Sequence, residues 1–297
     1  MVMEIIVNGV LLGAAYCLMT SGFALLISVG KVFDLTYGSY YLLSAYSIVG
    51  CVKLFEPHTG FLAALIIGIL VGITASSILA SFVHWQLIGP LRGQTFSIFI
   101  ITVMFALCVQ ESFIYTWGAE NIHVPLFARG MSQIFGVDVM NQKILVLIVT
   151  ALIVLSLWIF LGKTKLGLAL RSVAESQAAS RIVGIRLSKI YFLTGVLGGA
   201  LGAISGAFLC SIYVANPYAW MEIITIPFFI VIIAGMGNIW ACIPAAMIAG
   251  LIEVSSGFLI PQGVFLGRPI LLTIMIFFIL LKPNGLFGVR GWEDESE

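Results

Sequence analysis

Long apolar runs recur from one end of the chain to the other, separated by short polar stretches. A run of roughly 18 or more apolar residues is long enough to cross a hydrocarbon core about 30 Å thick as a helix. The pattern predicts an all-α, polytopic integral membrane protein with about eight or nine transmembrane helices. We expect the spans at about 5–29, 35–54, 60–83, 95–117, 143–162, 190–214, 223–236, 239–260 and 268–282.

Two of these spans are short or interrupted. The sequence DLTYG stands at the start of the span 35–54, and GMGNIW follows the span 223–236. Broken helices at membrane depth are tolerated only where they are buried in protein or line a cavity. Each of the two segments is therefore a candidate half-helix that does not cross the membrane completely.

The composition excludes a water-soluble fold. Hydrophobic residues make up 61% of the chain and charged residues 9%, whereas soluble domains have about 25% charged residues. The first apolar run has no basic region before it and exceeds the 7–15 residues typical of a cleavable signal, so we expect it to be retained as a span. The five cysteines are far apart, which favours buried small hydrophobic side chains over a disulfide or a metal site.

One polar segment, KTKLGLALRSVAESQAASRIVGIRLSKI at 163–190, breaks the pattern. It holds six of the 14 Lys and Arg residues, and Glu175 is its only acid. Six such charges at the centre of a membrane helix would cost on the order of 15–20 kcal/mol, so the segment must lie outside the hydrocarbon. Its interior is rich in good helix formers and Gly184 resembles a C-terminal cap, which together predict a short surface helix.

The distribution of basic residues predicts the orientation. With nine spans and the segment 163–190 in the cytoplasm, ten Lys and Arg lie on the inner side and four on the outer side. This asymmetry follows the positive-inside rule. It places the N-terminus outside and the C-terminal EDESE in the cytoplasm.

No motif for catalysis or nucleotide binding is complete. GKT at 162–164 ends like a phosphate-binding loop, but Leu157 stands where the first glycine of that motif should be. We therefore expect no ATP hydrolysis by this chain, and neither a catalytic residue nor a metal site. The three histidines, His58, His84 and His123, fall in expected loops, and nothing in the sequence predicts a nucleic-acid partner.

Small residues repeat at four-residue spacing in GVLGGALGAISGAF. Such a face lets helix backbones approach closely, within one chain or between subunits, and direct contact with a transported solute is the alternative. The glycines concerned are Gly195, Gly198, Gly199, Gly202 and Gly206.

Polar side chains inside the expected spans are costly and are functional candidates by default. The alternative is that Asp34 and Asn238 only cap broken helices and that Glu111 lies near the outer interface. No Lys, Arg or His stands at helical spacing from these acids within the same spans, so no proton relay is recognisable. The set is Asn8, Asp34, Gln110, Glu111, Asn238 and Glu253.

The order of several motifs resembles the branched-chain amino acid ABC permeases (LivH/LivM type, closer to LivH), and the resemblance covers nearly the whole chain. The N-terminal NGVLLGAAYCLMTSGFALLISVGKVFDLTYGSYYLLSAY is similar to the opening of that family. RSVAESQAASRIVGI is similar to its cytoplasmic loop, and NPY, GMGNIWACIPAAMIAGLIE and KPNGLFG are similar to its later elements. Three features depart from the family pattern: Asp34 stands where the turn usually has Asn, Thr36-Tyr37 replaces Ala-His, and WACIPAA stands where the later motif has its Gly-Ala.

This resemblance implies an ABC importer permease fold in a single transmembrane domain, 1–297, in a bacterial or archaeal inner membrane. The implied partners are a second related permease subunit in a heterodimer, two cytoplasmic ATPase subunits, an external solute-binding protein and membrane lipid. The chain itself would need no cofactor, because ATP and Mg²⁺ would be bound by the ATPases. The implied cargo is a small polar solute, most simply a branched-chain or other neutral amino acid. Urea, short amides or another small metabolite are alternatives, and an ion-coupled secondary transporter is the rival class.

The resemblance also assigns expected roles to residues. Segment 163–190 would couple to the ATPase through a docking face that includes Val173, and a basic loop that only meets anionic lipid is the alternative. The expected coupling residues are Arg171, Ala174, Glu175, Ala178, Ala179, Ile182 and Gly184. The two glycine-containing turns are where we expect the translocation path, whose candidates are Asn8, Tyr16, Asp34, Tyr37, Gly38, Gly235, Gly237, Asn238 and Glu253.

Overall fold

The computed structural model describes residues 2–91, 93–213, 215–235, 237–259, 263–282 and 285. Within the 297-residue chain it forms two compact units. The first contains Met1–Ala24, Phe127–Ile159 and Thr225–Glu297, and the second contains Leu25–Leu126 and Phe160–Ile224. Arg92, Arg290, EDESE and most of KPNGLFG lie outside the described residues.

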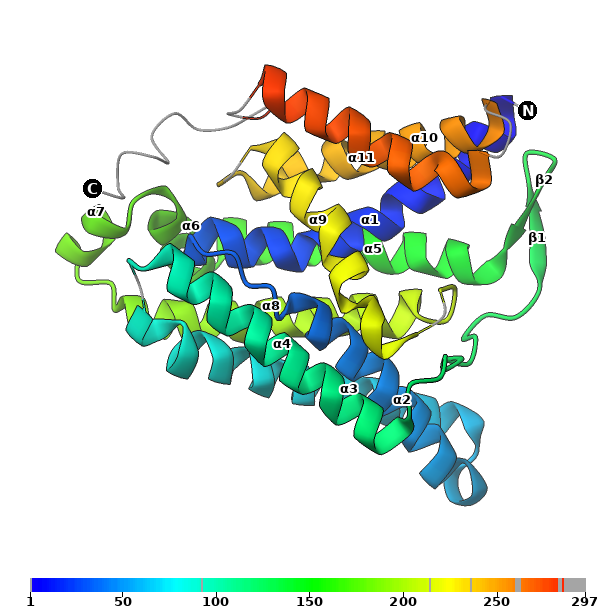
Figure 1. Ribbon diagram of the computed structural model, residues 1–297, viewed down its shortest axis with the longest axis horizontal. Helices are drawn as coiled ribbons and strands as arrows, with labels where there is room; N and C mark the ends of the chain where they lie inside the picture. Colours follow the sequence, from blue (N-terminus) through cyan, green and yellow to red (C-terminus); the bar gives the residue numbers. More distant parts are fainter. Residues whose placement is uncertain are drawn as a thin grey trace. The chain divides into compact units, whose positions relative to one another are not determined.

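Helices dominate the described part of the chain, as the apolar pattern predicts (Figure 1). Their bounds are α1 Val2–Gly30, α2 Tyr37–Thr59, α3 Phe61–Phe82, α4 Thr95–Trp117, α5 Asn141–Lys163, α6 Lys165–Glu175, α7 Gln177–Ile182, α8 Leu187–Leu209, α9 Trp220–Ala234, α10 Cys242–Leu259 and α11 Gly263–Leu281. Short helical turns of other types cover Val83–Leu87, Gly89–Leu91, Pro217–Ala219 and Ile239–Ala241.

Seven of the described helical stretches are long and apolar enough to cross a membrane. The two other expected spans correspond to α2, which is less apolar, and to α11, whose apolar part Leu266–Leu281 is shorter. The expectation of half-helices is not supported by helix length. Helix α2 has 23 residues, and α9 with the turn before it has 18.

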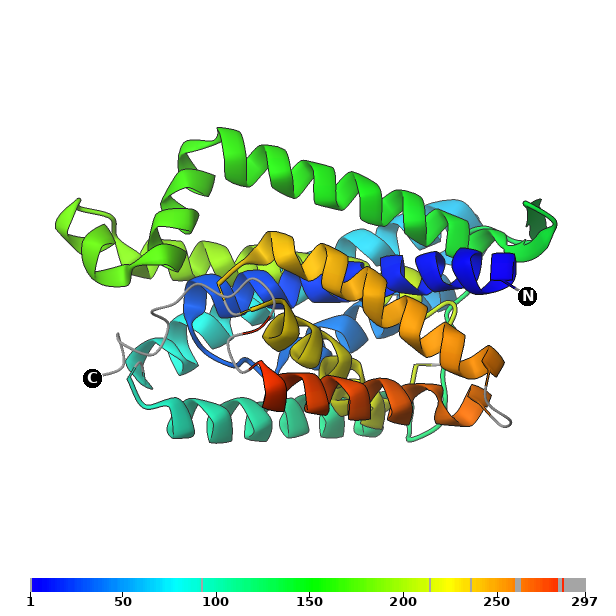
Figure 2. The same ribbon diagram turned by 90° about the horizontal axis from the view of Figure 1, so that it is seen from above.

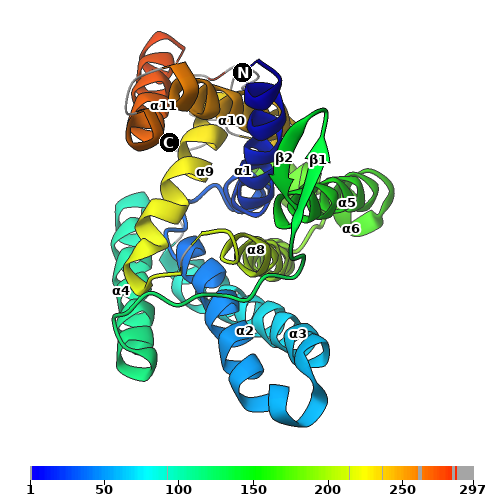
Figure 3. The same ribbon diagram turned by 90° about the vertical axis from the view of Figure 1, so that its right-hand side faces the viewer.

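In the second unit, α8 packs against α2 and α3 through its glycines (Figure 3). A side chain at Gly206 would run into the backbone carbonyl oxygen of Tyr41 in α2, and one at Gly199 would come within 2.6 Å of the Ser76 carbonyl oxygen in α3. Gly195 faces α3, Gly198 faces Leu26, and Gly202 faces Tyr37. The backbone contacts of Gly199 and Gly206 leave no room for a side chain, and all five residues serve close packing within the unit.

In the first unit, α1 and α10 cross closely at glycines. A Cβ at Gly9 would lie 2.6 Å from the side chain of Leu251, and one at Gly13 would lie 2.8 Å from the Cα of Met247. Gly250 of α10 lies against the α1 backbone at the same crossing. Helix α5 joins this group through Thr150, whose hydroxyl donates to the Ala14 carbonyl at 3.2 Å.

A β-hairpin that the apolar pattern does not predict follows α4. Strands β1 Met131–Ile134 and β2 Val137–Met140 pair antiparallel, with Ile134 opposite Val137 at the turn. Val137 and Val139 are buried and pack with Leu11 of α1. Phe135 at the turn is 78% exposed. Gly136 at the turn has φ +77° and marks a turn that the sequence signals only weakly.

The cysteines also separate into two classes. All five are free thiols, in agreement with the absence of paired spacing in the sequence. Four are buried as expected, whereas Cys108 of α4 is exposed. Helix α4 is apolar and only partly covered by the chain, so an exposed thiol on it is compatible with a lipid-facing position.

Replacing Gly206 by Ala should destabilise the protein by about 1–3 kcal/mol, because the added methyl overpacks the contact with the Tyr41 carbonyl. Gly162→Ala in α5 is the matched control, since a Cβ there meets nothing within 4 Å. The control should be neutral or slightly stabilising, because alanine is the better helix former. Unfolding in detergent measures both changes, and an equal effect of the two would contradict the packing role of Gly206.

Candidate translocation and coupling sites

The turn between α1 and α2 carries a buried carboxylate, Asp34. Its Oδ1 accepts hydrogen bonds from the Thr36 backbone N–H at 2.9 Å and from the Thr36 hydroxyl. Its Oδ2 accepts the Tyr40 phenol at 2.9 Å and lies 3.1 Å from His84 Nε2. Asp34 and His84 are both shielded from solvent. The pairing is physically required, because an isolated charge in this environment would be very costly.

His84 is the principal site residue that the sequence does not reveal. It was expected in a loop, but it lies buried in the turn Val83–Leu87 that continues α3. Its partner Asp34 is 50 residues earlier, so a search for cations at helical spacing from Asp34 could not find it. Asp34 has no basic residue at helical spacing within its own span, but His84 from another helical segment pairs with it. His84 Nδ1 is buried and has no hydrogen-bond partner among the described residues.

Tyr37 and Gly38 start α2 beside this network. Tyr37 is fully buried next to Gly202 of α8, and Gly38 lies directly against the backbone of Trp220. The Trp220 indole N–H in turn donates to Gln110 Oε1 at 2.7 Å. Glu111, the neighbour of Gln110, is exposed. The start of α2 thus lies against Gly202 of α8 and Trp220 of α9, and Gln110 of α4 holds the Trp220 indole.

The remaining path candidates lie in the first unit. Gly235 and Gly237 have φ of +101° and +100°, which glycine adopts at no steric cost, and they end α9. The Asn238 side-chain oxygen accepts the N–H groups of Trp240 and Ala241 at 3.2 and 3.3 Å. Asn238 therefore caps the turn that begins after the break. Asn8 donates to the Glu4 carbonyl of its own helix at 3.0 Å.

Two path candidates from distant parts of the sequence meet in the first unit. The Tyr16 phenol of α1 donates to Glu253 Oε2 of α10. Glu253 Oε1 also lies 3.5 Å from Arg268 Nε of α11. Arg268 stands 15 residues after Glu253 on another helix, and the sequence pattern gave no reason to join them. Glu253, like Asp34, is thus paired rather than isolated.

The coupling segment forms two helices instead of the single one expected (Figure 2). Thr164 caps α6 by accepting the Gly167 N–H at 2.9 Å, and Ser176 caps α7 by accepting the Ala179 N–H at 3.3 Å. Ser176 is thus the single residue between α6 and α7, and its hydroxyl caps the start of α7. Gly184, with φ +87°, follows the last turn of α7, and the Ile185 N–H bonds back to the Ser180 carbonyl at 3.0 Å.

Burial divides the expected coupling residues. Val173 is fully buried, so its predicted place on the docking face is wrong. It lies with Leu170 on the buried side of an amphipathic helix, which contacts α8. Ala174 is half-buried. The exposed residues of the expected set are Arg171, Glu175, Ala178, Ala179, Ile182 and Gly184.

Clusters of potential metal ligands are absent from the described part of the chain. Those residues contain no group of three or more His, Cys, Asp or Glu side chains that could hold a metal ion. The polar clusters are instead built around single acids: Asp34 contacts Thr36, Tyr40 and His84, and Glu253 contacts Tyr16 and Arg268. Arrangements of this kind can hold helices together or bind a charged solute.

Replacing His84 by Leu should lower the free energy of unfolding by about 3–5 kcal/mol, because it leaves the Asp34 carboxylate buried without its imidazole partner. The double variant Asp34→Asn/His84→Leu should lose less than the sum of the single changes, since it removes the charge as well. His58→Leu, at an exposed position of α2, is the control and should change stability by no more than about 0.5 kcal/mol. Unfolding in detergent checks the cycle, and strictly additive losses would show that the pair is not coupled.

Comparisons with known proteins agree with this architecture. The family model described as "Branched-chain amino acid transport system / permease component" matches residues 5–281. The chain is 26% identical over 300 residues to the high-affinity branched-chain amino acid transport system permease protein LivH of Escherichia coli strain K12, covering 95% of this chain and 94% of that protein.

More distant relatives are of the same kind. The permease protein BraD of Pseudomonas aeruginosa is 26% identical over 298 residues, covering 95% of this chain and 94% of that protein. The probable LivH of Methanocaldococcus jannaschii is 25% identical over 92% of this chain and 88% of its own length. No solved structure matches the chain significantly. Because the family model spans almost the entire sequence, the chain belongs to the family of branched-chain amino acid transport permease components.

Proposed function

We propose that this chain is the membrane-spanning subunit of an ABC importer that moves branched-chain amino acids into the cell. It is a multi-pass protein of the inner membrane, and its energy comes from ATP bound with Mg²⁺ on separate ATPase subunits. A second, related permease chain completes the pathway as a heterodimer, two ATPases bind from the cytoplasm, and an external solute-binding protein delivers the cargo. The exposed, doubly capped segment α6–α7 is the observation that carries this proposal.

The geometry of α6–α7 suits a coupling element. A single residue connects α5 to α6, and a single residue connects α6 to α7, so the connections leave the helices little freedom to move independently. Leu170 and Val173 are buried and fix α6 on the second unit. Ile182, which is 87% exposed, and Val183 form an apolar end on α7. In this segment α6 is anchored and α7 ends in exposed apolar side chains. Such a segment can dock into a groove of a partner protein and move with it as a rigid body.

The basic residues on and near α7 are compatible with docking on an ATPase, and they are equally compatible with contact with anionic lipid. Arg171 of α6, Arg181 of α7 and Arg186 after α7 are all exposed. A basic loop that serves only to meet anionic lipid would gain from further positive charge, because each Lys or Arg near such a surface adds about 1 kcal/mol of attraction. A docking face would instead be blocked by a long charged side chain. Addition of an arginine therefore separates the two roles.

The cargo is assigned through the family. The printed names of the relatives describe branched-chain amino acid transport, and the family model carries the same description. Urea, short amides or another small metabolite remain the alternative cargo of the same transporter class. An ion-coupled secondary transporter is the alternative class, and the buried acid Asp34 with its His84 partner is the feature that favours it.

We expect Ala178→Arg to reduce co-purification of the ATPase subunits at least about tenfold, because Ala178 is exposed on α7 and an arginine there would block docking. Glu175→Lys should act in the same direction. Ala119→Arg is the matched control, since Ala119 is exposed in the loop after α4 on the proposed outer side. Retained ATPase with Ala178→Arg, together with stronger binding to anionic vesicles, would instead indicate the lipid role.

The transporter class is tested in liposomes. Uptake of leucine should require the ATPases, ATP and the binding protein. Leucine uptake by the chain alone, driven by an ion gradient, would refute the ABC mechanism and favour the secondary transporter. Uptake of urea instead of leucine by the complete complex would retain the class and change the cargo.

The proposed orientation, with the N-terminus outside, is inferred from the distribution of basic residues and can be tested by cysteine labelling. A single cysteine introduced at Phe135, which is 78% exposed at the hairpin turn, should react with an impermeant thiol reagent from outside the cell. A single cysteine at Ile182 should react only after the membrane is permeabilised. Both variants are made in a background without the five native cysteines. The reverse labelling pattern would place the N-terminus in the cytoplasm.

A further inference from the structure

A second polar cluster and an apolar pocket both involve α10 and α11 in the first unit. The carboxylate of Glu253 in α10 pairs with Arg268 of α11 at 3.5 Å and accepts the Tyr16 phenol of α1. Glu253 is 15% exposed and Arg268 is 46% exposed, so the pair is open on one side. This differs from the Asp34–His84 pair of the second unit, which is sealed.

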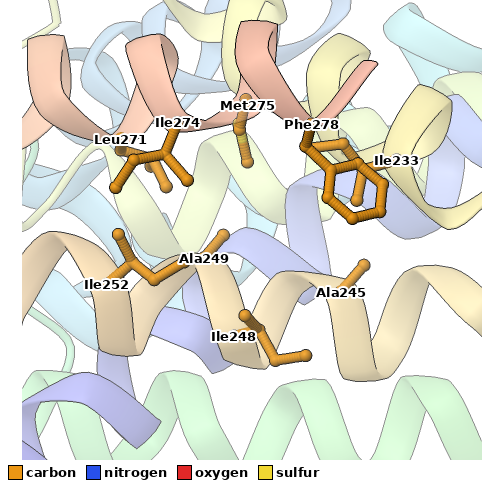
Figure 4. A pocket seen from close by; sticks show the side chains of 9 residues that line it. All are labelled: Ile233, Ala245, Ile248, Ala249, Ile252, Leu271, Ile274, Met275 and Phe278. Atoms are coloured by element: carbon orange, nitrogen blue, oxygen red, sulfur yellow. The ribbon is translucent and has the colours of Figure 1, made fainter. Parts of the chain in front are cut away.

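The pocket lies between the same two helices and is lined only by apolar side chains (Figure 4). Its volume is about 90 Å³. Ile252 and Leu271 lie at one end, and Ala245 and Phe278 lie at the other. Further lining comes from Ile233 of α9, Ala249 of α10 and Met275 of α11.

Helix register brings the charged pair to the end of the pocket formed by Ile252 and Leu271. Arg268 precedes Leu271 by three residues, so both side chains project from the same face of α11. Glu253 follows Ile252 directly and stands four residues after Ala249, which places it at the edge of the pocket-lining face of α10. The 3.5 Å contact between Glu253 and Arg268 joins the two faces there.

Charge and shape together match one class of ligand. A guanidinium has five N–H donors and can serve the ligand's carboxylate while it still meets Glu253. A carboxylate has about four acceptor positions, so Glu253 can accept an ammonium group in addition to the Tyr16 phenol. The pocket is smaller than the roughly 150 Å³ cavity that holds benzene and larger than the roughly 30 Å³ share of one water, which suits a branched group of three or four carbons.

We propose that Glu253, Arg268 and the apolar pocket between α10 and α11 bind the zwitterionic head and the branched side chain of the cargo amino acid. This proposal rests on the proposed function and adds the residues of this chain that recognise the cargo. Glu253 receives the ammonium group, Arg268 receives the carboxylate, and the side chain enters between Ile252 and Leu271. Tyr16 orients the Glu253 carboxylate from α1.

The test uses the complete transporter in proteoliposomes and compares leucine with valine, which has one methylene less, in the same vesicles. The ratio of the two uptake rates cancels differences in the amount of folded protein. Ala249→Val fills the pocket and should lower the leucine-to-valine ratio roughly tenfold, as expected for one methylene in a closely fitting apolar site. Ile252→Val enlarges the pocket and should raise the ratio. Ala151→Val, at an exposed position of α5, is the matched control and should leave the ratio unchanged.

The charged pair is tested by a swap. Arg268→Gln and Glu253→Gln should each reduce leucine uptake at least about tenfold. The double variant Glu253→Arg/Arg268→Glu retains an ion pair between α10 and α11 but exchanges the positions of the two charges. A pair that only joins helices would recover uptake in the swap, whereas a pair that binds the head groups of an L-amino acid beside a fixed pocket would not.

The outcomes separate this proposal from the proposed function. If the wild-type complex transports leucine, and both pocket variants transport it with an unchanged ratio, the binding site is wrong and the function stands. Full recovery by the charge swap would also overturn the site. If the wild-type complex with its partners transports neither amino acid, the proposed cargo is wrong, and this site is wrong with it.

Discussion

Close contact between helix backbones is the constraint on which the second unit depends. In a bilayer, helices gain little from apolar burial against each other, so close packing and polar contacts must hold them. The glycines of α8 provide this packing against α2 and α3. The same face supports the buried network, because a Cβ at Gly195 would lie 3.2 Å from the Cβ of His84 and one at Gly202 would lie 3.4 Å from the Cβ of Tyr40. Glycine at these two positions of α8 leaves room for His84 and Tyr40, which both contact the Asp34 carboxylate.

The two polar clusters differ in a way that indicates different roles. Asp34 has four hydrogen-bonding or ionic partners and no contact with solvent, so exchange of any partner would expose a costly unpaired group. Glu253 and Arg268 are partly exposed, and an apolar pocket lies between the helices α10 and α11 that carry them. A sealed network suits a fixed support, whereas an open pair suits a ligand that comes and goes. Both acids were equal candidates in the sequence, and only their surroundings distinguish them.

Much of the fold could be predicted from the sequence, because a membrane span is a local property of a continuous apolar run. All nine expected spans correspond to helices, and the polar segment 163–190 is helical at the expected place. Its division at Ser176 and the hairpin around Phe135-Gly136 do have local signals, in a helix-capping hydroxyl and a glycine turn between alternating residues. Arg268 and His84 could not be predicted as site residues. Their partners come from other helices, and only the packing of the chain brings them together.

The burial of α2 bears on how the protein is made. The first half of α2 is almost wholly buried by other helices of the second unit, so few of its side chains contact lipid. Helix α2 can therefore be less apolar than the seven clear spans. The insertion machinery, however, meets each segment before its final neighbours are present, and it sorts segments by their own hydrophobicity. The helical stretch Phe61–Leu91, which begins with α3, reaches a mean hydropathy of 2.5 and follows α2 after the single residue Gly60. Entry of α2 into the bilayer therefore depends on its synthesis being followed at once by α3, with the two inserting as a helical hairpin.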